Sequence, residues 1–358
     1  MPSPHGAFSG RWGLPETGSG LPTVVVVGSA HMDLIATADR LPVRGETLPG
    51  RHLGIHPGGK GLNQAVQVAL AGARSVFLGR LGGDDFGRRL RSSLVEKGVV
   101  TDWLRDDERL ATGASTVFVG EDGDYCSVVF PGAGLSLSKE DIAEARDAFA
   151  GARAVVAQLE LPVETIGSAL EIGRRVGATT ILNAAPAPES AAVLASIFPL
   201  VDILVVNQVE AAMLVGGGKG GGANAEAREV LRQICSDHGI GSAVLTLGSD
   251  GAVVLAEGRL EEIIGHRVAV VDDIGAGDAF VGTMVAHLAG GAALTTATRR
   301  GNAAGALAVT GSGAYDSLPS AAAVDQFLKA GIRAAGTRLA QASAVVAPRP
   351  ASTTKFAS

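Results

Sequence analysis

The ten residues Val271-Asp-Asp-Ile-Gly-Ala-Gly-Asp-Ala-Phe280 form the most informative segment of the sequence. Gly275, Ala276 and Gly277 can present successive backbone N–H groups at the start of a helix that we expect to begin near Asp278. Such a helix end binds anions without needing a lysine. Asp278 could cap that helix, where a negative charge is favourable, or it could take a proton from an attacking hydroxyl group. These residues alone leave both interpretations open.

A second glycine-rich segment, Pro57-Gly-Gly-Lys-Gly-Leu-Asn-Gln-Ala65, predicts a turn that runs into a helix. Together with the residues before it, the segment nearly matches the phosphate-loop pattern GxxxxGK[ST]. Gly61, however, stands where that pattern has the hydroxyl that holds Mg²⁺. The dinucleotide pattern GxGxxG fails in both segments, because Gln64 and Phe280 occupy its third glycine position. Neither GxSxG nor HExxH occurs, which excludes two hydrolase classes.

Along the rest of the chain, short apolar runs alternate with helical patterns. This alternation predicts an α/β fold with a mostly parallel central sheet that helices cover on both faces. The expected strands are Thr23–Val27, Ser75–Leu78, Ala154–Leu159, Thr179–Leu182, Ile203–Val206, Ala243–Leu247 and Ala252–Leu255. The expected helices are Gly61–Ala71, Phe86–Lys97, Lys139–Phe149, Val163–Val176, Ala225–His238 and Ala279–Ala289.

Two segments interrupt this alternation. Residues 33–56 are extended and rich in turns, and residues 112–130 read as a hairpin joined by the acidic turn GEDGD. We expect them to form a small β-sheet lid on a domain of residues 22–335. Residues 1–21 and 336–358 are expected to be a flexible leader and a flexible tail, and the GGGKGGG run at 216–222 a surface loop.

Composition excludes several classes of protein. The net charge is −6, so no basic surface for nucleic acid is expected. The two cysteines, Cys126 and Cys235, are too far apart in sequence for a CxxC motif, which fits a reducing cytoplasm. Residues 1–20 lack the apolar core of a signal peptide. Residues 279–298 carry no Asp, Glu, Lys or Arg, but their glycines and threonines favour a buried helix over a membrane span.

Taken together, GGKGLNQA and DDIGAGDAF resemble the two signatures of the PfkB carbohydrate kinase family, and in particular its ribokinase-like members. The resemblance covers about residues 23–330. It implies a ribokinase-like three-layer α/β/α sandwich with a small β-sheet lid. Further matches follow in the family's order: Gly28–Asp33, Leu41–Thr47, Gln158–Glu160, Asn207–Glu210, Thr246–Ser249 and Ala308–Gly313.

The resemblance implies an ATP-dependent kinase that phosphorylates the hydroxymethyl group of a pentose, with D-ribose converted to D-ribose 5-phosphate. Asp278 would be the base, and the amides of Gly275, Ala276 and Gly277 would form an anion hole for the γ-phosphate. A polyol needs carboxylate and amide acceptors together with close backbone approach. The implied sugar-binding residues supply both, and they are His31, Asp33, Gly58, Gly59, Lys60, Asn63, Glu160 and Asp278.

The resemblance also implies the positions of the co-substrate and the ions. The ATP-binding residues would be Asn207, Thr246, Leu247, Gly248, Ser249, Asp250, Gly251, Gly277 and Asn302. Asn207 and Glu210 match an NxxE motif that helps to place Mg²⁺, partly through water, although they could instead form only a polar turn at a strand end. A monovalent cation, K⁺, is implied near Asp272, Ile274, Ala308, Gly311, Gly313 and Ser317.

Two residues depart from the family's pattern. His31 stands where the family usually has Asn at a sugar-contacting position, and Asp273 replaces a common threonine beside the cation loop. A nucleoside or another sugar is therefore an alternative substrate, and a non-catalytic sugar- or nucleotide-binding regulator is an alternative of another class. By analogy with the family, we expect a cytoplasmic homodimer formed through the lid. Its partners would be sugar and ATP, with neither nucleic acid nor membrane.

Overall fold

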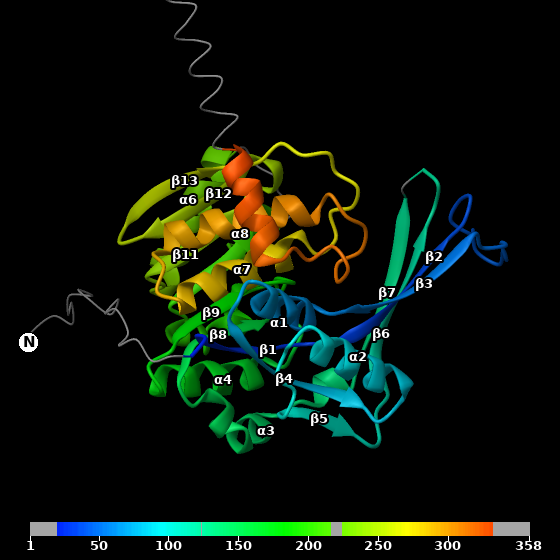
Figure 1. The fold of residues 1–358 in the computed structure, drawn as a ribbon, viewed down its shortest axis with the longest axis horizontal. Helices are drawn as coiled ribbons and strands as arrows, with labels where there is room; N and C mark the ends of the chain where they lie inside the picture. The colour runs from blue at the N-terminus through cyan, green and yellow to red at the C-terminus, as the bar shows by residue number, and fades with distance from the viewer. Residues whose placement is uncertain (1–19, 123, 216–223, 332–358) are drawn as a thin grey trace, which may run out of the picture.

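The computed structural model describes residues 20–122, 124–215 and 224–331 (Figure 1). Within these residues the larger sheet has nine strands in the order β13-β12-β11-β10-β9-β8-β1-β4-β5. Neighbours from β5 to β11 pair in parallel, whereas β12 and β13 are antiparallel. The strands are β1 Thr23–Val27, β4 Arg74–Gly82, β5 Leu104–Asp107, β8 Ala152–Gln158, β9 Thr179–Asn183, β10 Ile203–Asn207, β11 Ser242–Thr246, β12 Gly251–Ala256 and β13 Arg259–Ile264.

Helices cover both faces of this sheet. The α-helices are α1 Lys60–Leu70, α2 Asp85–Glu96, α3 Lys139–Glu144, α4 Val163–Arg175, α5 Gln208–Leu214, α6 Asn224–His238, α7 Ala276–Ala289 and α8 Leu294–Ala308, and residues 321–331 are also helical. The 3₁₀ turns are η1 Ala133–Ser136, η2 Arg146–Phe149, η3 Ala191–Leu194, η4 Phe198–Leu200 and η5 Gly248–Asp250. In β1, Val24 and Val26 join one hydrophobic core and Val25 and Val27 the other, because successive side chains of a strand point to opposite faces. The predicted three-layer α/β/α fold is confirmed.

The sequence prediction differs from the structure at several elements. All seven expected strands are present, but β5, β13, α5, α8 and the helix over 321–331 were not predicted. The single helix expected over 139–149 is divided, because α3 ends at Glu144 and a 3₁₀ turn follows. The uncharged stretch 279–298 belongs to two helices, separated by a turn at which Gly291 has a φ of 88°. Among the described residues, no helix has both the length and the apolarity that crossing a membrane requires.

The expected lid is a four-stranded sheet that projects from one side of the body (Figure 1). Its order is β3-β2-β6-β7, with β2 His31–Thr37, β3 His52–Gly58, β6 Thr112–Val119 and β7 Tyr125–Gly132. The predicted hairpin is the antiparallel pair β6–β7, and β2 pairs in parallel with β6. Most of the predicted leader, all of the tail and the loop at 216–222 lie outside the described residues.

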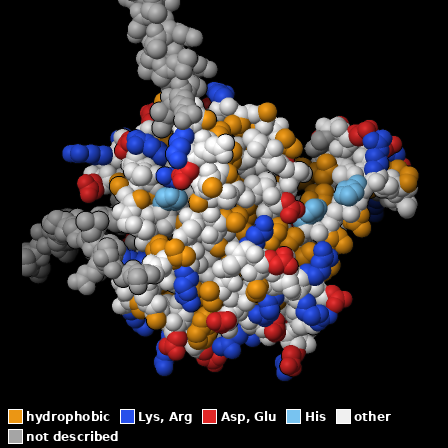
Figure 2. All heavy atoms as spheres, viewed as in Figure 1, with side chains coloured by type: hydrophobic (Ala, Val, Ile, Leu, Met, Phe, Trp, Pro, Cys, Tyr) orange, Lys and Arg blue, Asp and Glu red, His pale blue; other side chains and the backbone are white. Residues whose placement is uncertain are grey.

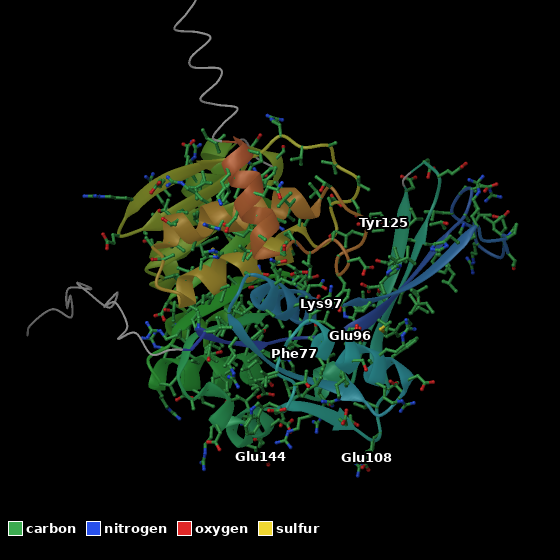
Figure 3. All side chains as sticks on the ribbon, viewed as in Figure 1. Phe77, Glu96, Lys97, Glu108, Tyr125 and Glu144 are labelled. Atoms are coloured by element: carbon green, nitrogen blue, oxygen red, sulfur yellow. The ribbon has the colours of Figure 1, made fainter. Side chains whose placement is uncertain are left out.

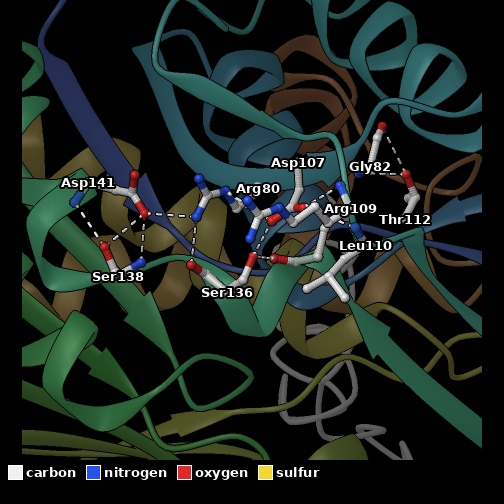
Figure 4. Close-up of polar contacts among 10 residues, drawn as sticks. Arg80, Gly82, Asp107, Arg109, Leu110, Thr112, Ser136, Ser138 and Asp141 are labelled. Carbon is white, nitrogen blue, oxygen red and sulfur yellow. Dashed lines mark hydrogen bonds and ion pairs between the residues drawn. The ribbon is translucent and has the colours of Figure 1, made fainter.

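A polar cluster around Arg80 ties the lid to the body (Figure 4). Arg80 Nη1 donates to the Ser136 carbonyl at 2.7 Å and contacts Asp141 Oδ2 at 3.1 Å. Asp107 accepts hydrogen bonds from the Ser136 hydroxyl at 2.9 Å and from the backbone N–H groups of Arg109 and Leu110. Since 107–112 leads into β6 and 132–138 leads out of β7, these bonds fix both connections at the base of the lid.

A close backbone approach places the first turn of α1 beside the end of β1. A Cβ atom on Gly61 would lie 2.6 Å from backbone atoms of Gly28, so no larger residue fits there. The N–H of Leu62 donates to the Ser29 carbonyl at 2.9 Å. This contact brings the GGKGLNQA segment to the carboxyl edge of the parallel sheet, which is where ligands bind in open α/β folds.

Candidate active site

Asp278 lies in the first turn of α7, at the carboxyl edge of the large sheet. The helix begins at Ala276, two residues before the expected position, and its N-cap Gly275 has a φ of 81° that favours glycine. A Cβ on Gly275 would also lie 2.7 Å from the Ala314 backbone. The first amides of the helix have no carbonyl partner within it, so they face the site as donors. Of the three amides expected to form the anion hole, that of Ala276 donates to the Asp273 carbonyl at 3.4 Å, whereas those of Gly275 and Gly277 have no backbone acceptor among the described residues.

The Asp278 carboxylate contacts α1 and makes no capping hydrogen bond to its own helix. Asn63 Nδ2 donates to Asp278 Oδ2 at 3.0 Å, and Gln64 Nε2 donates to Asp278 Oδ1 at 2.9 Å. Burial raises the pKa of Asp278 to about 6, and the charge of Lys60 and the two amide donors oppose that rise. A carboxyl group with such a pKa is ionised at neutral pH and still basic enough to accept a proton. The capping interpretation does not account for this arrangement.

Lys60, the first residue of α1, is surrounded by carboxylates. Its burial lowers its pKa, but the charges of Asp278, Glu160 and Glu210 outweigh burial, and the pKa lies above the ordinary lysine value. The ammonium group is therefore charged at neutral pH. This charge faces the acidic residues and would face any phosphate that binds among them.

The sugar-binding residues predicted on β2 and β3 meet at the base of the lid. His31 pairs with Gly58 in the β2–β3 register, and His31 Nε2 lies 3.2 Å from Asp33 Oδ1. Asp33 also accepts a hydrogen bond from the Ser115 hydroxyl. A Cβ on Gly58 would lie 2.0 Å from Asp33 Oδ2, so glycine is needed for the aspartate to lie there. Burial lowers the pKa of His31, but Asp33 and Glu160 together raise it above its ordinary value.

Glu160 and Asn63 complete this group from the body of the protein. Glu160 Oε2 accepts hydrogen bonds from the Ser29 hydroxyl and from the Lys60 backbone N–H, the latter at 3.0 Å. The Asn63 amide oxygen is buried and has no hydrogen-bond partner among the described residues. An unpartnered buried acceptor is costly, so Asn63 is suited to receive a hydroxyl donor from a ligand.

A cavity of about 740 Å³ lies beside the first turn of α7. Seven of the predicted ATP-binding residues line it: Asn207, Thr246, Gly248, Ser249, Gly251, Gly277 and Asn302. Leu247 and Asp250, also predicted, are not among its lining residues. Apolar residues that the sequence analysis did not identify supply much of the remaining wall, including Val268, Val270 and Val309. A large cavity with apolar walls and a few polar groups fits a nucleobase and ribose.

A smaller cavity of about 150 Å³ connects this region to Asp278. Its lining includes Lys60, Glu210, Gly275 and Asp278, and it shares Asn207, Thr246 and Gly277 with the large cavity. The arrangement can hold a phosphate chain whose end reaches the helix N-terminus and Lys60. A hydroxyl group beside Asp278 would then lie next to the terminal phosphate.

Asn207 and Glu210 form a reciprocal capping box at the start of α5. The Asn207 N–H donates to Glu210 Oε2, and the Glu210 N–H donates to Asn207 Oδ1, both at 2.8 Å. Burial raises the pKa of Glu210, whereas the Asn207 N–H and Lys60 lower it. Asn207 and Glu210 thus form the polar turn at the strand end that the sequence analysis considered. Both residues also line the small cavity, so a second role beside phosphate remains open to them. Among the described residues, no cluster of three or more His, Cys, Asp or Glu side chains could hold a metal ion by itself.

The residues predicted for a monovalent cation come from two adjoining loops. Asp272 joins them, because its Oδ1 accepts from the Ile274 N–H at 3.0 Å and its Oδ2 from the Gly313 N–H at 2.9 Å. Gly311 packs against Ser317, whose buried hydroxyl has no partner among the described residues. These loops flank Gly275, where a Cβ would lie 2.7 Å from the Ala314 backbone.

Several residues of the site were not identified from the sequence. Ser29 and Ser115 donate to Glu160 and Asp33, and Gln158 and Asn183 lie behind Asp278. Ser29, Gln64 and Gln158 lie within motifs that the sequence analysis quoted, and Gln158 and Asn183 end two parallel strands. Position at a strand's carboxyl end was the available signal. No sequence pattern marks Ser115, which is placed by the pairing of β6 with β2.

The chain matches the family described as "pfkB family carbohydrate kinase" over residues 21–321. It is 33% identical over 317 residues to a ribokinase of Mus musculus, a match that covers 87% of this chain and 97% of that protein. It is 31% identical over 307 residues to a ribokinase of Haemophilus influenzae, covering 86% and 98% of the two chains.

Solved structures agree with these sequence relatives. A ribokinase of Arabidopsis thaliana, complexed with ribose and ATP, has a TM-score of 0.80 and 27% identity and covers 87% of this chain and 99% of its own. A ribokinase of Thermotoga maritima has a TM-score of 0.77 and 29% identity, with coverage of 86% and 99%.

Proposed function

The chain belongs to the PfkB family of carbohydrate kinases and is an ATP-dependent sugar kinase, and we propose that its substrate is D-ribose, phosphorylated on the hydroxymethyl group to D-ribose 5-phosphate. The observation that carries the proposal is the buried Asp278 carboxylate between a cavity of nucleotide size and the carboxylates of the lid base.

Asp278 would accept the proton of the attacking sugar hydroxyl. Its pKa of about 6 and its two amide donors support this role, which is worth roughly 10²–10⁴-fold in rate. The amides of Gly275, Ala276 and Gly277, at the N-terminus of α7, would stabilise negative charge on the transferring phosphoryl group. Lys60 would add a positive charge on the same side.

The large cavity would hold the adenosine moiety of ATP, with Asn207, Thr246, Ser249 and Asn302 among its polar groups. Mg²⁺ fits the Asn207–Glu210 pair as a water-mediated neighbour. The capping box uses Glu210 Oε2 and leaves Oε1 for a metal-bound water, and Mg²⁺ gives up its waters reluctantly. When bound, the ion would neutralise charge on the phosphate oxygens.

The sugar would lie among His31, Asp33, Asn63 and Glu160, with the backbone of Gly58 and Gly59 beside it. The orphan acceptor of Asn63 and the clustered carboxylates support a ligand rich in hydroxyl donors. Lid strands β2 and β6 supply His31, Asp33 and Ser115, so closure of the lid would exclude water from the phosphoryl transfer.

K⁺ would bind between the loops that Asp272 joins, near Ile274, Ala308, Gly311, Gly313 and Ser317. The unpartnered Ser317 hydroxyl supports an additional ligand there. The ion would order the loop before Gly275 without touching the sugar.

The lid would also form a homodimer. Its edge strand β7 exposes Val128, Val129 and Phe130, each more than half accessible. Figure 2 shows hydrophobic side chains on the lid, and Figure 3 labels Tyr125 on β7. An open edge with apolar side chains favours pairing with a second copy.

The free thiols of Cys126 and Cys235 fit a cytoplasmic enzyme.

An ADP-release assay with a panel of ribose, 2-deoxyribose, fructose and a ribonucleoside tests the substrate. We expect ribose to have the highest kcat/KM. Preference for a nucleoside would reject ribose but retain a kinase, whereas sugar binding without ADP release would support the non-catalytic alternative.

A further inference from the structure

A chain of buried amide side chains lies behind Asp278, on α1, β8 and β9. Gln64 Nε2 donates to Asp278 Oδ1 and to Asn183 Oδ1, both at 2.9 Å. Gln158 Nε2 donates to the Gln64 amide oxygen at 2.6 Å. Gln64 and Gln158 are fully buried and Asn183 nearly so. Three strongly polar groups thus occupy the interior where apolar packing would be the simpler solution.

The orientation of Gln64 follows from a backbone carbonyl. Asn183 Nδ2 donates to the Val205 carbonyl at 3.4 Å, and a carbonyl can only accept. The Asn183 amide oxygen therefore faces Gln64, whose two N–H groups donate hydrogen bonds to Asn183 and Asp278. The Gln158 donor on Gln64 Oε1 favours the same orientation. Each contact pairs a donor with an acceptor. Exchanging the oxygen and nitrogen of the Gln64 amide would place its oxygen against the oxygens of Asn183 and Asp278.

We propose that Gln64 is a positioning residue for phosphoryl transfer, and that Asn183 and Gln158 hold its amide as a donor to Asp278. This inference rests on the proposed role of Asp278 as the base. The amide hydrogen bond fixes one carboxylate oxygen and leaves the carboxylate's remaining lone pairs for the sugar hydroxyl. Because amides do not titrate in the working range, the donor persists at every pH at which the enzyme works.

The amide chain also affects the proton affinity of the base. Burial raises the pKa of Asp278, and the charge of Glu160 adds to that rise. The charge of Lys60 and the hydrogen bonds from Gln64 and Asn63 lower the pKa. Without the Gln64 donor the carboxyl group would hold its proton to higher pH, and a smaller fraction of the enzyme would be competent near neutrality. A merely structural glutamine would have no such effect.

Gln67 provides a matched control one turn along α1. It is fully buried, and its Nε2 donates to the Thr283 hydroxyl at 2.9 Å and the Pro319 carbonyl at 3.0 Å. Loss of its amide removes one hydrogen bond between α1 and α7, as loss of the Gln64 amide does, and two buried hydrogen bonds in all against three for Gln64. It makes no hydrogen bond to Asp278.

The experiment compares Gln64→Met, Gln158→Met and Gln67→Met in the full chain, by thermal unfolding and by kcat and sugar KM from pH 5 to 9. For Gln64→Met we expect kcat to fall about tenfold or more, as for loss of a hydrogen bond to a charged group. The ratio of kcat/KM at pH 6 to that at pH 8 should fall severalfold. Gln158→Met should shift the profile in the same direction but less. Gln67→Met should lower the unfolding temperature and leave the pH profile unchanged.

The outcomes separate this inference from the proposed function. If Asp278→Asn is inactive while Gln64→Met and Gln158→Met keep the wild-type pH profile, the inference is wrong and the base assignment stands. If Gln64→Met does not fold, Gln158→Met carries the same test. If Asp278→Asn remains active, the assignment of Asp278 as the base fails. Titration of the Asp278 carboxyl ¹³C signal then still decides the amide chain, since Gln64→Met should raise its midpoint.

Discussion

Asn63 and Asp278 are 215 positions apart in the chain, and Asn63 Nδ2 donates to Asp278 Oδ2 at 3.0 Å. The bond joins the two glycine-rich motifs through the packing of α1 against α7. A Cβ on Gly282 would lie 2.6 Å from the Gln67 side chain, so glycine lets these helices approach closely. Asp278 and α1 are therefore held together as one unit, while the small sheet contributes His31, Asp33 and Ser115 to the proposed sugar site.

Replacing Asp278 with Asn should reduce kcat by at least about 10²-fold while sugar and ATP still bind. The change removes the proton acceptor but keeps the shape of the side chain. Steady-state kinetics measures the loss, and calorimetric titration with sugar measures the affinity. Retention of more than about a tenth of wild-type kcat would exclude Asp278 as the base.

Activity should decline as the pH falls through about 6. Only the ionised Asp278 carboxylate can accept the hydroxyl proton, and its pKa is raised by burial to about 6. At pH 5 kcat/KM should be about a tenth of its plateau, because roughly one enzyme molecule in ten would then be ionised. A pH–rate profile checks this, with the folded state verified by circular dichroism at each pH. A flat profile from pH 8 to 5 would contradict it.

Activity should require K⁺ and fall when Na⁺ or a bulky organic cation replaces it. The reason is the pair of loops that Asp272 joins beside Gly275, which an ion would order. Initial rates in buffers of equal ionic strength provide the measurement. Equal rates without K⁺ would reject the site, and Asp273→Thr would then test whether the second aspartate is responsible.

The variant His31→Asn should lower the KM for ribose. An imidazole directs its two nitrogens to different sides of a ring, whereas an amide presents its donor and acceptor side by side, and His31 already contacts Asp33 at 3.2 Å. A mismatched sugar hydroxyl costs about 1–3 kcal/mol, or about tenfold or more in KM. Kinetics with ribose, 2-deoxyribose and fructose in both proteins test this. An unchanged ribose KM and order of preference would make His31 a structural residue.

The variant Val128→Lys should weaken self-association without altering the active site, because Val128 pairs with Thr116 on the face of the lid opposite to that of Asp33 and Ser115. It places a charge on the exposed edge strand β7, where positive charge opposes strand pairing. Sedimentation at several concentrations measures the effect, with Val176→Lys on the exposed end of α4 as the control. A wild-type protein that is monomeric at all concentrations would contradict dimerisation.

Much of the catalytic site was predictable because the relevant residues are local in sequence. The pattern Gly275–Asp278 specifies a helix N-terminus with an acidic first turn, whatever the rest of the chain does. The apolar runs that form β1 and β8 to β12 were likewise predictable, because strands buried on both faces are nearly continuous in hydrophobicity. Strand β13 was not, since the exposed side chains of Arg259, Glu261 and Glu262 leave it little apolar pattern on either face.

By itself the sequence determined the α/β class, the segments of the small sheet, and the choice of Asp278 and the glycines before it as candidate site residues. These depend on periodicity and on neighbouring residues. Only the tertiary structure decided which side chains meet. The donors Ser115 and Ser29, the orientation of Gln64 and the pKa of Asp278 all depend on contacts between residues far apart in the chain. Burial and hydrogen bonding set the proton affinity of a carboxyl group, and neither is encoded within a short stretch of residues.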